Sequence, residues 1–404
     1  MVPEEWRTAN VRQLCSKVTD GTHDTPTPVD GGIPYITAIH VKDGHIRFDD
    51  CLFLTEDDHR EIYRRCNPQF GDLVVVNIGA GVGQCAAVNV TFEFSMKNVA
   101  LLKPNPEHID PKFLFQAFRS EESRIGREAR SGGAQPFISL RHLGQLRFLV
   151  PPIPEQKKIA EILSTWDAAI ETTEKLLANA VAQKRAFMQQ LLTGKRRLNG
   201  FGGPWARQTL RDVAEVIVSN VDKKSVDGDI PVRLCNYMDV YANDILQPSL
   251  PFMEATATSA QIKKFGLHVG DVLITKDSET PSDIAVPAYV SATADDLVCG
   301  YHLAIIRPGP RASGRFLKFY FEHPHTQTYF ASRANGATRF GLRVGSIEEA
   351  PIQLPTLEEQ ERIADAIATV ETEAKRLKSS IKLYRAEKAA LMQQLLTGKW
   401  RVTV

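Results

Sequence analysis

The stretch FMQQLLTGKR at residues 187–196 returns almost unchanged as LMQQLLTGKW at residues 391–400. The two copies lie 204 positions apart, because Met188 corresponds to Met392. A long match at a fixed distance indicates a structural unit that occurs twice in one chain. The extent of the match therefore decides how the chain is divided.

The repeat continues upstream of this stretch without a gap. EQKKIAEIL at residues 155–163 corresponds to EQERIADAI at residues 359–367, at the same offset of 204. A register free of gaps over roughly 40 residues is typical of one rigid element. Further upstream, GDLVVV at Gly71 corresponds to GDVLIT at Gly270, so the offset there is 199. Each copy is therefore a variable module followed by a nearly invariant tail.

Both tails have the apolar spacing of a long helix, with steps of three and four residues. The positions in the first tail are Ile159, Ile162, Trp166, Ala169, Thr173, Leu176, Ala180, Phe187 and Leu191. Those in the second tail are Ile363, Ile367, Val370, Ala374, Leu377, Ile381, Tyr384, Leu391 and Leu395. A helix of about 38 residues spans roughly 57 Å, and its single apolar seam needs a partner. We expect the two tails to pair with each other in antiparallel orientation.

Residues that favour helix ends border each tail. Pro154 suits the first turn of the first helix, and Thr356 with Glu359 predicts a capping box for the second. Gly194 and Gly398 stand where a glycine would stop each helix, just before cationic residues. The sequence therefore predicts both ends of both helices.

The two modules combine strand-like and helix-like segments. The first contains IPYITAIHV and DLVVVNI, followed by the helix-like PKFLFQAFRSEESRIGREAR. The second contains IPVRLCNYMDV and DVLITK, followed by GRFLKFYFEHPHTQTYFASRA. Short β-type runs bounded by turns, with a helix ahead of the tail, predict an α+β module in each half.

These observations predict an α+β protein with two tandem modules, at residues 1–154 and 198–358. Two long helical regions, at residues 155–197 and 359–404, separate them and pack as an antiparallel coiled coil. We expect an approximate two-fold relation between the halves, with the modules at opposite ends of the helical pair.

Composition places the chain among ordinary soluble proteins. It has 404 residues, of which 43% are hydrophobic and 24% charged, and a net charge of +1. Its start lacks the features of a signal peptide, and no apolar run reaches the ~18 residues that a membrane span needs. We expect a cytoplasmic protein without membrane contact. The six cysteines form no CxxC pair, so free and mostly buried thiols are expected rather than a zinc site.

The sequence contains no convincing catalytic motif. GAGVG at Gly79 is followed by a strand-like segment, whereas a dinucleotide-binding loop would lead into a helix. The TGK of each tail lacks the earlier glycine and the following hydroxyl residue of a phosphate-binding loop. The ten histidines form no HExxH pair. We expect no catalytic residue and no metal ligand in this chain.

The alternation of a variable module with an LVPPIPEQKKIAEIL and MQQLLTGK tail resembles the specificity subunit of type I restriction-modification systems. DGTHDTP at Asp20 and the GGAQPFI loop at Gly132 are similar to the target-recognition domains of that family. The resemblance covers the whole chain. The second module departs from it, because VSNVDKKS stands where the first has DGTHDTP.

This resemblance implies that each module reads one half of a bipartite target in double-stranded DNA. The helical pair would set the unread spacer and dock the modification (methyltransferase) subunits. A restriction subunit, an ATP-dependent translocase and nuclease, would be a further partner. S-adenosylmethionine, ATP and Mg would belong to those subunits, and this chain would bind no cofactor.

Candidate contact residues follow from chemistry, since polar side chains read base edges and cations hold phosphates. The DNA-binding candidates of the first module are Thr22, His23, Thr25, Lys97, Asn98, Arg130, Gln135 and Arg141. Those of the second module are Asn236, Tyr237, Lys276, His302, Arg333, Thr338, Arg339 and Arg343. The candidates for partner docking are Gln189, Gln190, Gln393 and Gln394, for which helix-end packing is an almost equal explanation.

Two other classes of protein remain open at this point. A coiled-coil scaffold without DNA binding would show no salt-dependent affinity for DNA. A catalytic methyltransferase or nuclease would modify or cut DNA without partners, and the missing motifs disfavour it.

Overall fold

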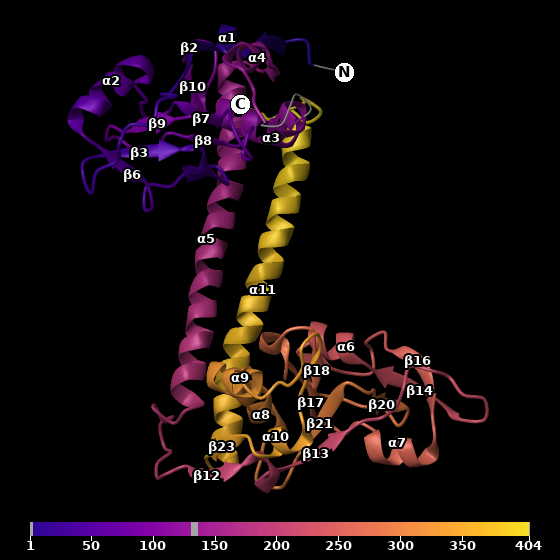
Figure 1. Cartoon of the computed structure of the whole chain (residues 1–404). Coiled ribbons are helices and arrows are strands. Elements are labelled where there is room, and N and C mark those ends of the chain that lie inside the picture. The colour runs from indigo at the N-terminus through magenta and orange to yellow at the C-terminus, as the bar shows by residue number, and fades with distance from the viewer. Residues whose placement is uncertain (1–2, 131–135, 404) are drawn as a thin grey trace. The chain divides into compact units, whose positions relative to one another are not determined.

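The computed structural model describes residues 3–130 and 136–403 (Figure 1). Contacts within the chain divide it into two compact units. The first unit comprises Met1–Lys175 with Lys378–Val404, and the second comprises Leu176–Leu377. Two helices of 39 residues, α5 (Ile153–Leu191) and α11 (Leu357–Leu395), contribute to both units. Each unit therefore contains the beginning of one long helix and the end of the other.

The first unit combines these helix segments with a module of short strands and helices. Its elements are β1 (Arg7–Asn10), α1 (Val11–Leu14), β2 (Cys15–Asp20), β3 (Ile33–Thr37), the 3₁₀ helix η1 (Ala38–His40), β4 (Val41–Lys42), β5 (His45–Ile46), β6 (Leu52–Leu54), α2 (Glu56–Cys66), β7 (Leu73–Val76), β8 (Cys85–Ala87), β9 (Ser95–Lys97), β10 (Val99–Pro104), α3 (Pro111–Arg130), α4 (Leu140–Gln145) and β11 (Arg147–Val150). The main sheet has the order β2-β10-β7-β8, and a second sheet has the order β6-β3-β9.

The second unit repeats this plan. Its elements are β12 (Ala206–Thr209), η2 (Leu210–Asp212), β13 (Ala214–Val218), β14 (Ile230–Cys235), α6 (Tyr237–Ala242), β15 (Ile245–Leu246), β16 (Met253–Ala257), α7 (Ser259–Phe265), β17 (Val272–Thr275), β18 (Asp277–Ser278), η3 (Pro281–Asp283), β19 (Pro287–Val290), β20 (Leu297–Cys299), β21 (Leu303–Pro308), α8 (Gly314–Glu322), α9 (Pro324–Ala331), β22 (Phe340–Gly341), α10 (Val344–Glu348) and β23 (Pro351–Leu354). Its sheets run β13-β21-β17-β19-β15 and β16-β14-β20, so the two strand orders match those of the first unit except that β15 adds a fifth strand to the main sheet. The predicted duplication of an α+β module is confirmed.

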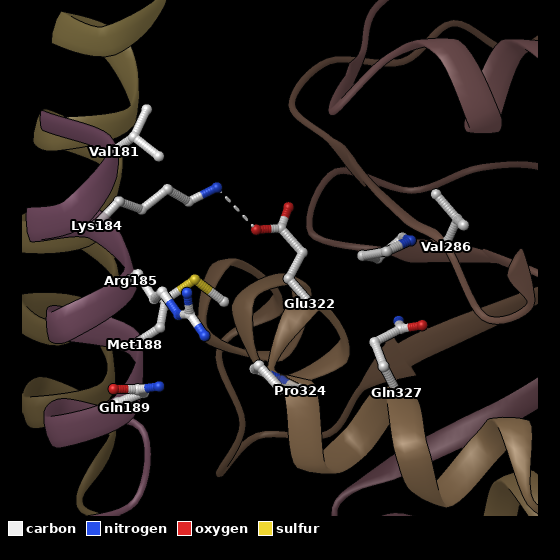
Figure 2. A pocket seen from close by; sticks show the side chains of 10 residues that line it. Val181, Lys184, Arg185, Met188, Gln189, Val286, Glu322, Pro324 and Gln327 are labelled. Atoms are coloured by element: carbon white, nitrogen blue, oxygen red, sulfur yellow. Dashed lines mark hydrogen bonds and ion pairs between the residues drawn. The ribbon is translucent and has the colours of Figure 1, made fainter. Parts of the chain in front are cut away.

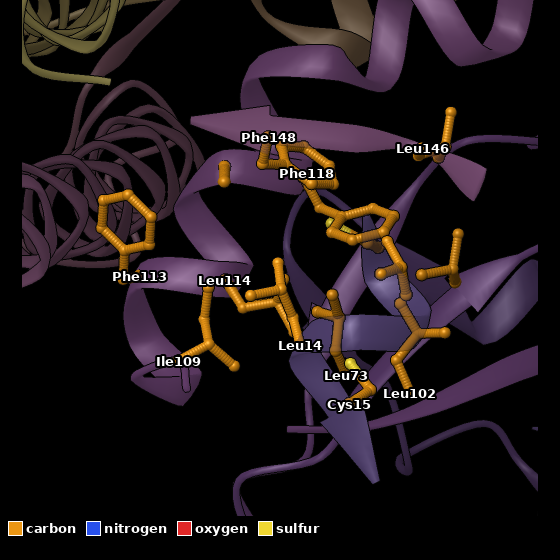
Figure 3. Close-up of a cluster of buried hydrophobic side chains, with 14 of the residues drawn as sticks. Leu14, Cys15, Leu73, Leu102, Ile109, Phe113, Leu114, Phe118, Leu146 and Phe148 are labelled. Carbon is orange, nitrogen blue, oxygen red and sulfur yellow. The ribbon is translucent and has the colours of Figure 1, made fainter. Parts of the chain in front are cut away.

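The core of the first unit joins the module to the long helices. Figure 3 shows Phe113, Leu114 and Phe118 of α3 gathered with Leu14 and Phe148 in one cluster. Leu163 of α5 and Leu395 of α11 belong to the same cluster. Burial of apolar surface therefore fixes the module to both helices.

Within each unit the paired helix segments are antiparallel, as predicted. In the first unit the Trp166 ring meets Tyr384 edge-on at 5.9 Å, and Lys388 Nζ donates to Asp167 Oδ1 at 2.6 Å. In the second unit Lys184 pairs with Glu371. Lys184 and Asp167 lie 204 positions before Lys388 and Glu371, so the same charge pair occurs twice, with the two helices exchanged. A charge pair within an otherwise apolar seam favours one register.

Two details of the predicted helices are wrong. Leu176 is 50% exposed, and its neighbour Leu177 packs in the apolar cluster with Ala180 instead. An α-helix drifts by about 20° per heptad relative to a strict seven-residue repeat, which turns Leu176 out of the seam. The capping box at Thr356 is only half formed. The Thr356 hydroxyl accepts from Glu359 N at 3.4 Å, but the Glu359 carboxylate accepts from Arg197 and does not return to the backbone of Thr356.

The helix ends carry an ion-pair clasp that recurs in both units. Arg197, just after α5, donates through Nε and Nη2 to the two carboxylate oxygens of Glu359, each at 2.6 Å. Arg401, just after α11, makes the same two contacts with Glu155 at 2.7 and 3.0 Å. Glu359 is 0% exposed and Glu155 3% exposed. The two carboxylates differ in one respect, because Glu155 also accepts from Trp6 Nε1 at 3.1 Å.

The glutamine after each of these glutamates anchors the helix to its module. Gln156 Nε2 donates to Pro151 O at 2.9 Å, and its Oε1 accepts from Asp110 N, just before α3, at 2.7 Å. Gln360 Oε1 accepts from Ser313 N, just before α8, at 2.8 Å. Both glutamines are buried. The repeated Glu-Gln pair therefore has a structural role in each unit.

Replacing the clasp arginine should destabilise the second unit more than the first. Arg197→Met leaves Glu359 buried without a cation, which costs about 3–5 kcal/mol of unfolding free energy. Arg401→Met should cost less, because Glu155 keeps its bond from Trp6. Urea unfolding followed by circular dichroism checks the difference. Equal losses in the two variants would contradict the assigned geometry.

Candidate nucleic-acid interface

In the first unit a polar cluster forms where β2 ends and β10 begins. Asp20 lies at its centre, with a side chain only 7% exposed. His23 Nε2 lies 2.9 Å from Asp20 Oδ2, and Arg65 Nη2 donates to Asp20 Oδ1 at 2.5 Å. His23 Nδ1 lies 3.3 Å from Asn98 Oδ1. The buried carboxylate thus holds a half-exposed imidazole and a half-exposed guanidinium at the surface.

The backbone dictates the position of this cluster. A side chain at Gly21 would place its Cβ 1.9 Å from Met96 O, so the loop can pass β9 only with glycine there. Thr22 N donates to Met96 O at 3.0 Å, and Asn98 N donates to Thr22 O at 3.3 Å. Asn98 itself has a φ of 56°, a left-handed conformation that asparagine tolerates better than most residues.

The remaining candidates of the same loop have different surroundings. Lys97 Nζ donates to the exposed Thr25 hydroxyl. Thr22 is only 8% exposed and its hydroxyl accepts from Asp24 N at 3.0 Å, so its side chain shapes the loop. The structure thus brings His23, Thr25, Lys97 and Asn98 together around Thr22.

In the second unit the equivalent region is a pocket of about 470 Å³. It is lined by Lys223, Tyr237, Met238, Tyr241, Asp277, Ser278, Glu279, Asp283, Tyr301, His302 and Arg339. The rings of Tyr237 and Tyr241 on α6 are stacked, with centroids 5.7 Å apart. The pocket therefore combines an aromatic wall with both cationic and acidic side chains.

A carboxylate organises this pocket too. Asp277 Oδ2 lies 2.5 Å from His302 Nδ1, and Asp277 Oδ1 accepts from Lys276 Nζ at 3.0 Å. His302 has a φ of 71° and directly precedes β21, as Asn98 directly precedes β10. The two left-handed residues therefore occupy equivalent turns. The sequences of the loops after β2 and β13 differ, yet Thr22 and Val221 form equivalent parallel bridges, with Lys97 and Gly300.

The glycine-containing loops before the long helices are tied to these regions. In the second unit Asp277 and Ser278 pair with Gly341 and Phe340 as the two-stranded ladder of β18 and β22. In the first unit Ile78 and Phe137 form the corresponding bridge, and Gly79 N donates to Pro136 O at 2.9 Å. Gln135, the candidate of this first loop, lies outside the described residues.

Two tyrosines of the pocket stay protonated at neutral pH. Burial raises the pKa of Tyr237, and the carboxylates of Asp283 and Glu279 add to this effect, against a hydrogen bond with Ser278. A hydrogen bond with Asp283, reinforced by its negative charge, raises the pKa of Tyr241. Both phenols remain hydrogen-bond donors over the physiological range.

Several predicted residues lie apart from these clusters. Asn236 caps α6, because its Oδ1 accepts from Met238 N at 3.1 Å. The Arg333 guanidinium lies over the Tyr329 ring at 3.6 Å, and Arg343 stands at the N-cap of α10. Arg130, Arg141 and Thr338 have exposed side chains, and among the described residues none of them hydrogen-bonds to either cluster.

Sequence reasoning missed the acidic members of both clusters and three of their neighbours. These residues are Asp20, Arg65, Lys223, Tyr241, Asp277, Glu279 and Asp283. Donors and cations carry the sequence signal for contact with nucleic acid, whereas the carboxylates that position them do not. Arg65 gave no sequence signal, because it lies 45 positions from Asp20.

The two clusters present different chemistry to a ligand. The first cluster offers the exposed imidazole of His23 and the partly buried side chains of Lys97 and Asn98, which are mainly hydrogen-bond donors. The second adds carboxylate acceptors beside Arg339 and the phenols. Donors of this kind match the acceptors of guanine, and carboxylates match the amino group of cytosine. The two clusters therefore present different polar groups at equivalent places in the two units.

The described part of the chain has no group of three or more His, Cys, Asp or Glu side chains that could hold a metal ion. All six cysteines are free and buried, as expected from the sequence. Among the described helices, none is long and apolar enough to cross a membrane.

Comparison with known families identifies the fold. The family described as type I restriction modification DNA specificity domain matches residues 3–180 and again residues 203–383. The two matches cover most of the chain and fall one on each repeat. The chain therefore belongs to this family and carries its domain twice in tandem. Recognition of a DNA target is the function that the family's description states.

Individual relatives are similar over more than nine tenths of their lengths. A protein of Methanocaldococcus jannaschii, described as a type I restriction enzyme MjaX specificity subunit, is 26% identical, with 99% of this chain and 95% of the relative covered. The EcoKI specificity subunit of Escherichia coli K12 is 20% identical over 99% of this chain and 91% of its own. The crystal structure of a type I S subunit from M. genitalium matches with a TM-score of 0.64 at 14% identity, covering 98% and 96% of the two chains.

The pocket of the second unit can be tested by the ionisation of its tyrosines. Asp283→Asn removes the acceptor and the charge that raise the pKa of Tyr241, so that pKa should fall toward 10.0. Ultraviolet titration at alkaline pH, compared with the same titration of Tyr241→Phe, isolates the group. A curve unchanged by Asp283→Asn would contradict the contact.

Proposed function

We propose that this chain reads a bipartite target in double-stranded DNA, with one half-site read by each unit. The observation that carries this proposal is the pair of equivalent clusters, at Asn98 and at His302, built on the same fold with different side chains. Two domains that recognise different half-sites need different polar side chains, and a shared backbone fold can carry both sets.

The different chemistry of the clusters supports two unlike half-sites. His23, Lys97 and Asn98 favour bases that offer acceptors, whereas Asp277 and Glu279 accept from exposed amino groups. Phosphate contacts from nearby cations would add affinity that does not depend on sequence. Because α5 and α11 contribute to both units, their fixed register would set the length of the unread spacer.

We assign catalysis to partners of this chain. Methylation would come from modification subunits that bind S-adenosylmethionine, and cleavage from a restriction subunit that uses ATP and Mg. A solved structure described as showing complex assembly of the type I R-M system has a TM-score of 0.52 and 15% identity to this chain. The fold is thus compatible with such an assembly.

The repeated glutamines are the candidate contact with modification subunits. Gln189, Gln190, Gln393 and Gln394 have exposed side chains, which make no hydrogen bond to the described residues. Their backbone carbonyls shape the helix ends instead, since Gln190 O accepts from Arg196 N and Gln394 O accepts from Trp400 N, two residues after each terminal glycine. Helix-end geometry therefore does not require a glutamine side chain at these positions.

A groove beside one of these glutamines adds to the docking proposal. It has a volume of about 540 Å³ and lies between the last turns of α5 and the segment from Glu322 to Gln327. Figure 2 shows Arg185, Met188 and Gln189 on the helix side, with Lys184 directed toward Glu322. An apolar side chain of a partner could enter here while Gln189 binds its backbone.

The first experiment maps DNA methylation directly. The chain is expressed with its modification subunit in a host without DNA methylation, and modified adenines are located by single-molecule sequencing. We expect one split motif with a fixed spacer. A stable complex that methylates nothing, and binds DNA without salt dependence, would favour the scaffold alternative.

Alanine variants then assign each half-site. Lys97→Ala with His23→Ala should relax only one half of the motif, and His302→Ala with Arg339→Ala only the other half. Loss of a base contact costs about 1–3 kcal/mol at one position, whereas loss of a phosphate contact weakens all sequences alike. Competition binding with half-site mutants of the duplex measures this. If both double variants lost specificity in the same half-site, the assignment of one half-site to each unit would be contradicted.

The docking proposal predicts a separable defect. Gln189→Ala with Gln190→Ala, combined with the same changes at Gln393 and Gln394, should reduce the modification subunit recovered with this chain. Gln183→Ala is the matched control, because it is an exposed glutamine on α5 that the second tail does not repeat. Unchanged recovery in the fourfold variant would assign these residues to the helix end alone.

A further inference from the structure

An exposed apolar side chain stands at the same position in both units. Ile39 is 79% exposed and Met238 is 58% exposed. They lie 199 positions apart, at the offset that relates the two modules. Each is the second residue of a short helical turn, η1 or α6, that follows the central strand of the smaller sheet with at most one residue between them. Exposing a large apolar side chain to water is unfavourable in free energy, and both units carry such a side chain at this position.

Both side chains are presented on a rigid backbone. Ahead of Ile39, Thr37 N donates to His40 Nδ1 at 2.9 Å. Ahead of Met238, Asn236 N donates to Asp239 Oδ2 at 2.8 Å. Both turns are therefore closed by a bond between the residue before the turn and its third residue. A side chain on such a turn loses little further freedom when it makes a contact.

Ile39 and Met238 lie next to the two polar clusters. In the first unit Thr37, two residues before Ile39, pairs with Lys97 across the parallel strands β3 and β9. In the second unit Met238 lines the pocket that contains His302 and Arg339. Cations and polar groups next to an isolated apolar side chain fit nucleic acid better than an apolar protein surface.

Position distinguishes these residues from other exposed apolar side chains. Phe70 and Val269 are also 199 positions apart and are 69% and 61% exposed. They precede β7 and β17, however, whereas the polar clusters lie beside the carboxyl ends of those strands, where Val76 pairs with Val99 and Thr275 with Leu303. A strand of four residues spans about 13 Å, so Phe70 and Val269 serve as matched controls at the far strand ends.

From this placement we infer that Ile39 and Met238 make apolar contacts with bases, one in each half-site. The inference rests on the proposed function and adds a specificity-determining residue to each cluster. Two kinds of apolar base contact share this chemistry. The side chain either touches the 5-methyl group of a thymine or enters between two stacked base pairs.

The test uses the complete complex with its modification subunit and the mapped target duplex. Ile39→Ser and Met238→Ser are compared with Phe70→Ser and Val269→Ser by equilibrium binding at one fixed salt concentration. We expect the first two variants to lose about 5- to 30-fold in affinity for the target and less than about 2-fold for unrelated DNA. Both control variants should keep the affinity ratio of the unchanged complex.

Modified duplexes separate the two kinds of contact. If Ile39 touches a methyl group, replacing one thymine by uracil weakens the unchanged complex and has no further effect on Ile39→Ser. If Ile39 enters the base stack, 2-aminopurine at one step brightens with the unchanged complex and not with the variant. Either result supports the inference, and the same pair of duplexes applies to Met238 in the other half-site.

Failure of the inference differs from failure of the proposed function. Target preference that survives intact in Ile39→Ser and Met238→Ser would overturn the inference alone. A loss that is equal for target and unrelated DNA would also overturn it. Absence of any preferred sequence in the unchanged complex would overturn the proposed function, and the inference with it.

Discussion

The ion-pair clasp at the helix ends is the constraint on which each unit depends. Glu155 and Glu359 are buried at the start of one long helix, and each is neutralised by an arginine that follows the other helix. A buried carboxylate without its cation is costly, so the end of one helix must return to the beginning of the other. The antiparallel pairing is thereby fixed by charge as well as by the apolar seam.

The two modules differ in sequence and share their anchoring residues, which are few and lie outside the two polar clusters. Gln156 and Gln360 bind the backbone before α3 and α8, so they hold any module that keeps this turn. The equivalent turns at Asn98 and His302 keep their left-handed backbone while their side chains differ. Constant backbone geometry with variable chemistry suits a protein that reads different sequences with one fold.

The sequence predicted the elements well and the sites in part. His23, Lys97 and Asn98 were singled out and do gather, because they flank strands whose pairing brings them together. Arg333 and Asn236 were also singled out, but they stack on a ring and cap a helix. A polar residue in a loop carries the same sequence signal in either role, and only its neighbours distinguish the two.

The sequence by itself determined the duplication, the two long helices and their ends, which lie in the turn before Gly194 and Gly398. These features are local, since periodicity and capping act within a few residues. Tertiary structure alone decided the clasp between Arg401 and Glu155, which are 246 positions apart, and the carboxylates that centre the two clusters. Contacts at such separation depend on how the strands and helices pack in three dimensions. No spacing in the sequence encodes that packing.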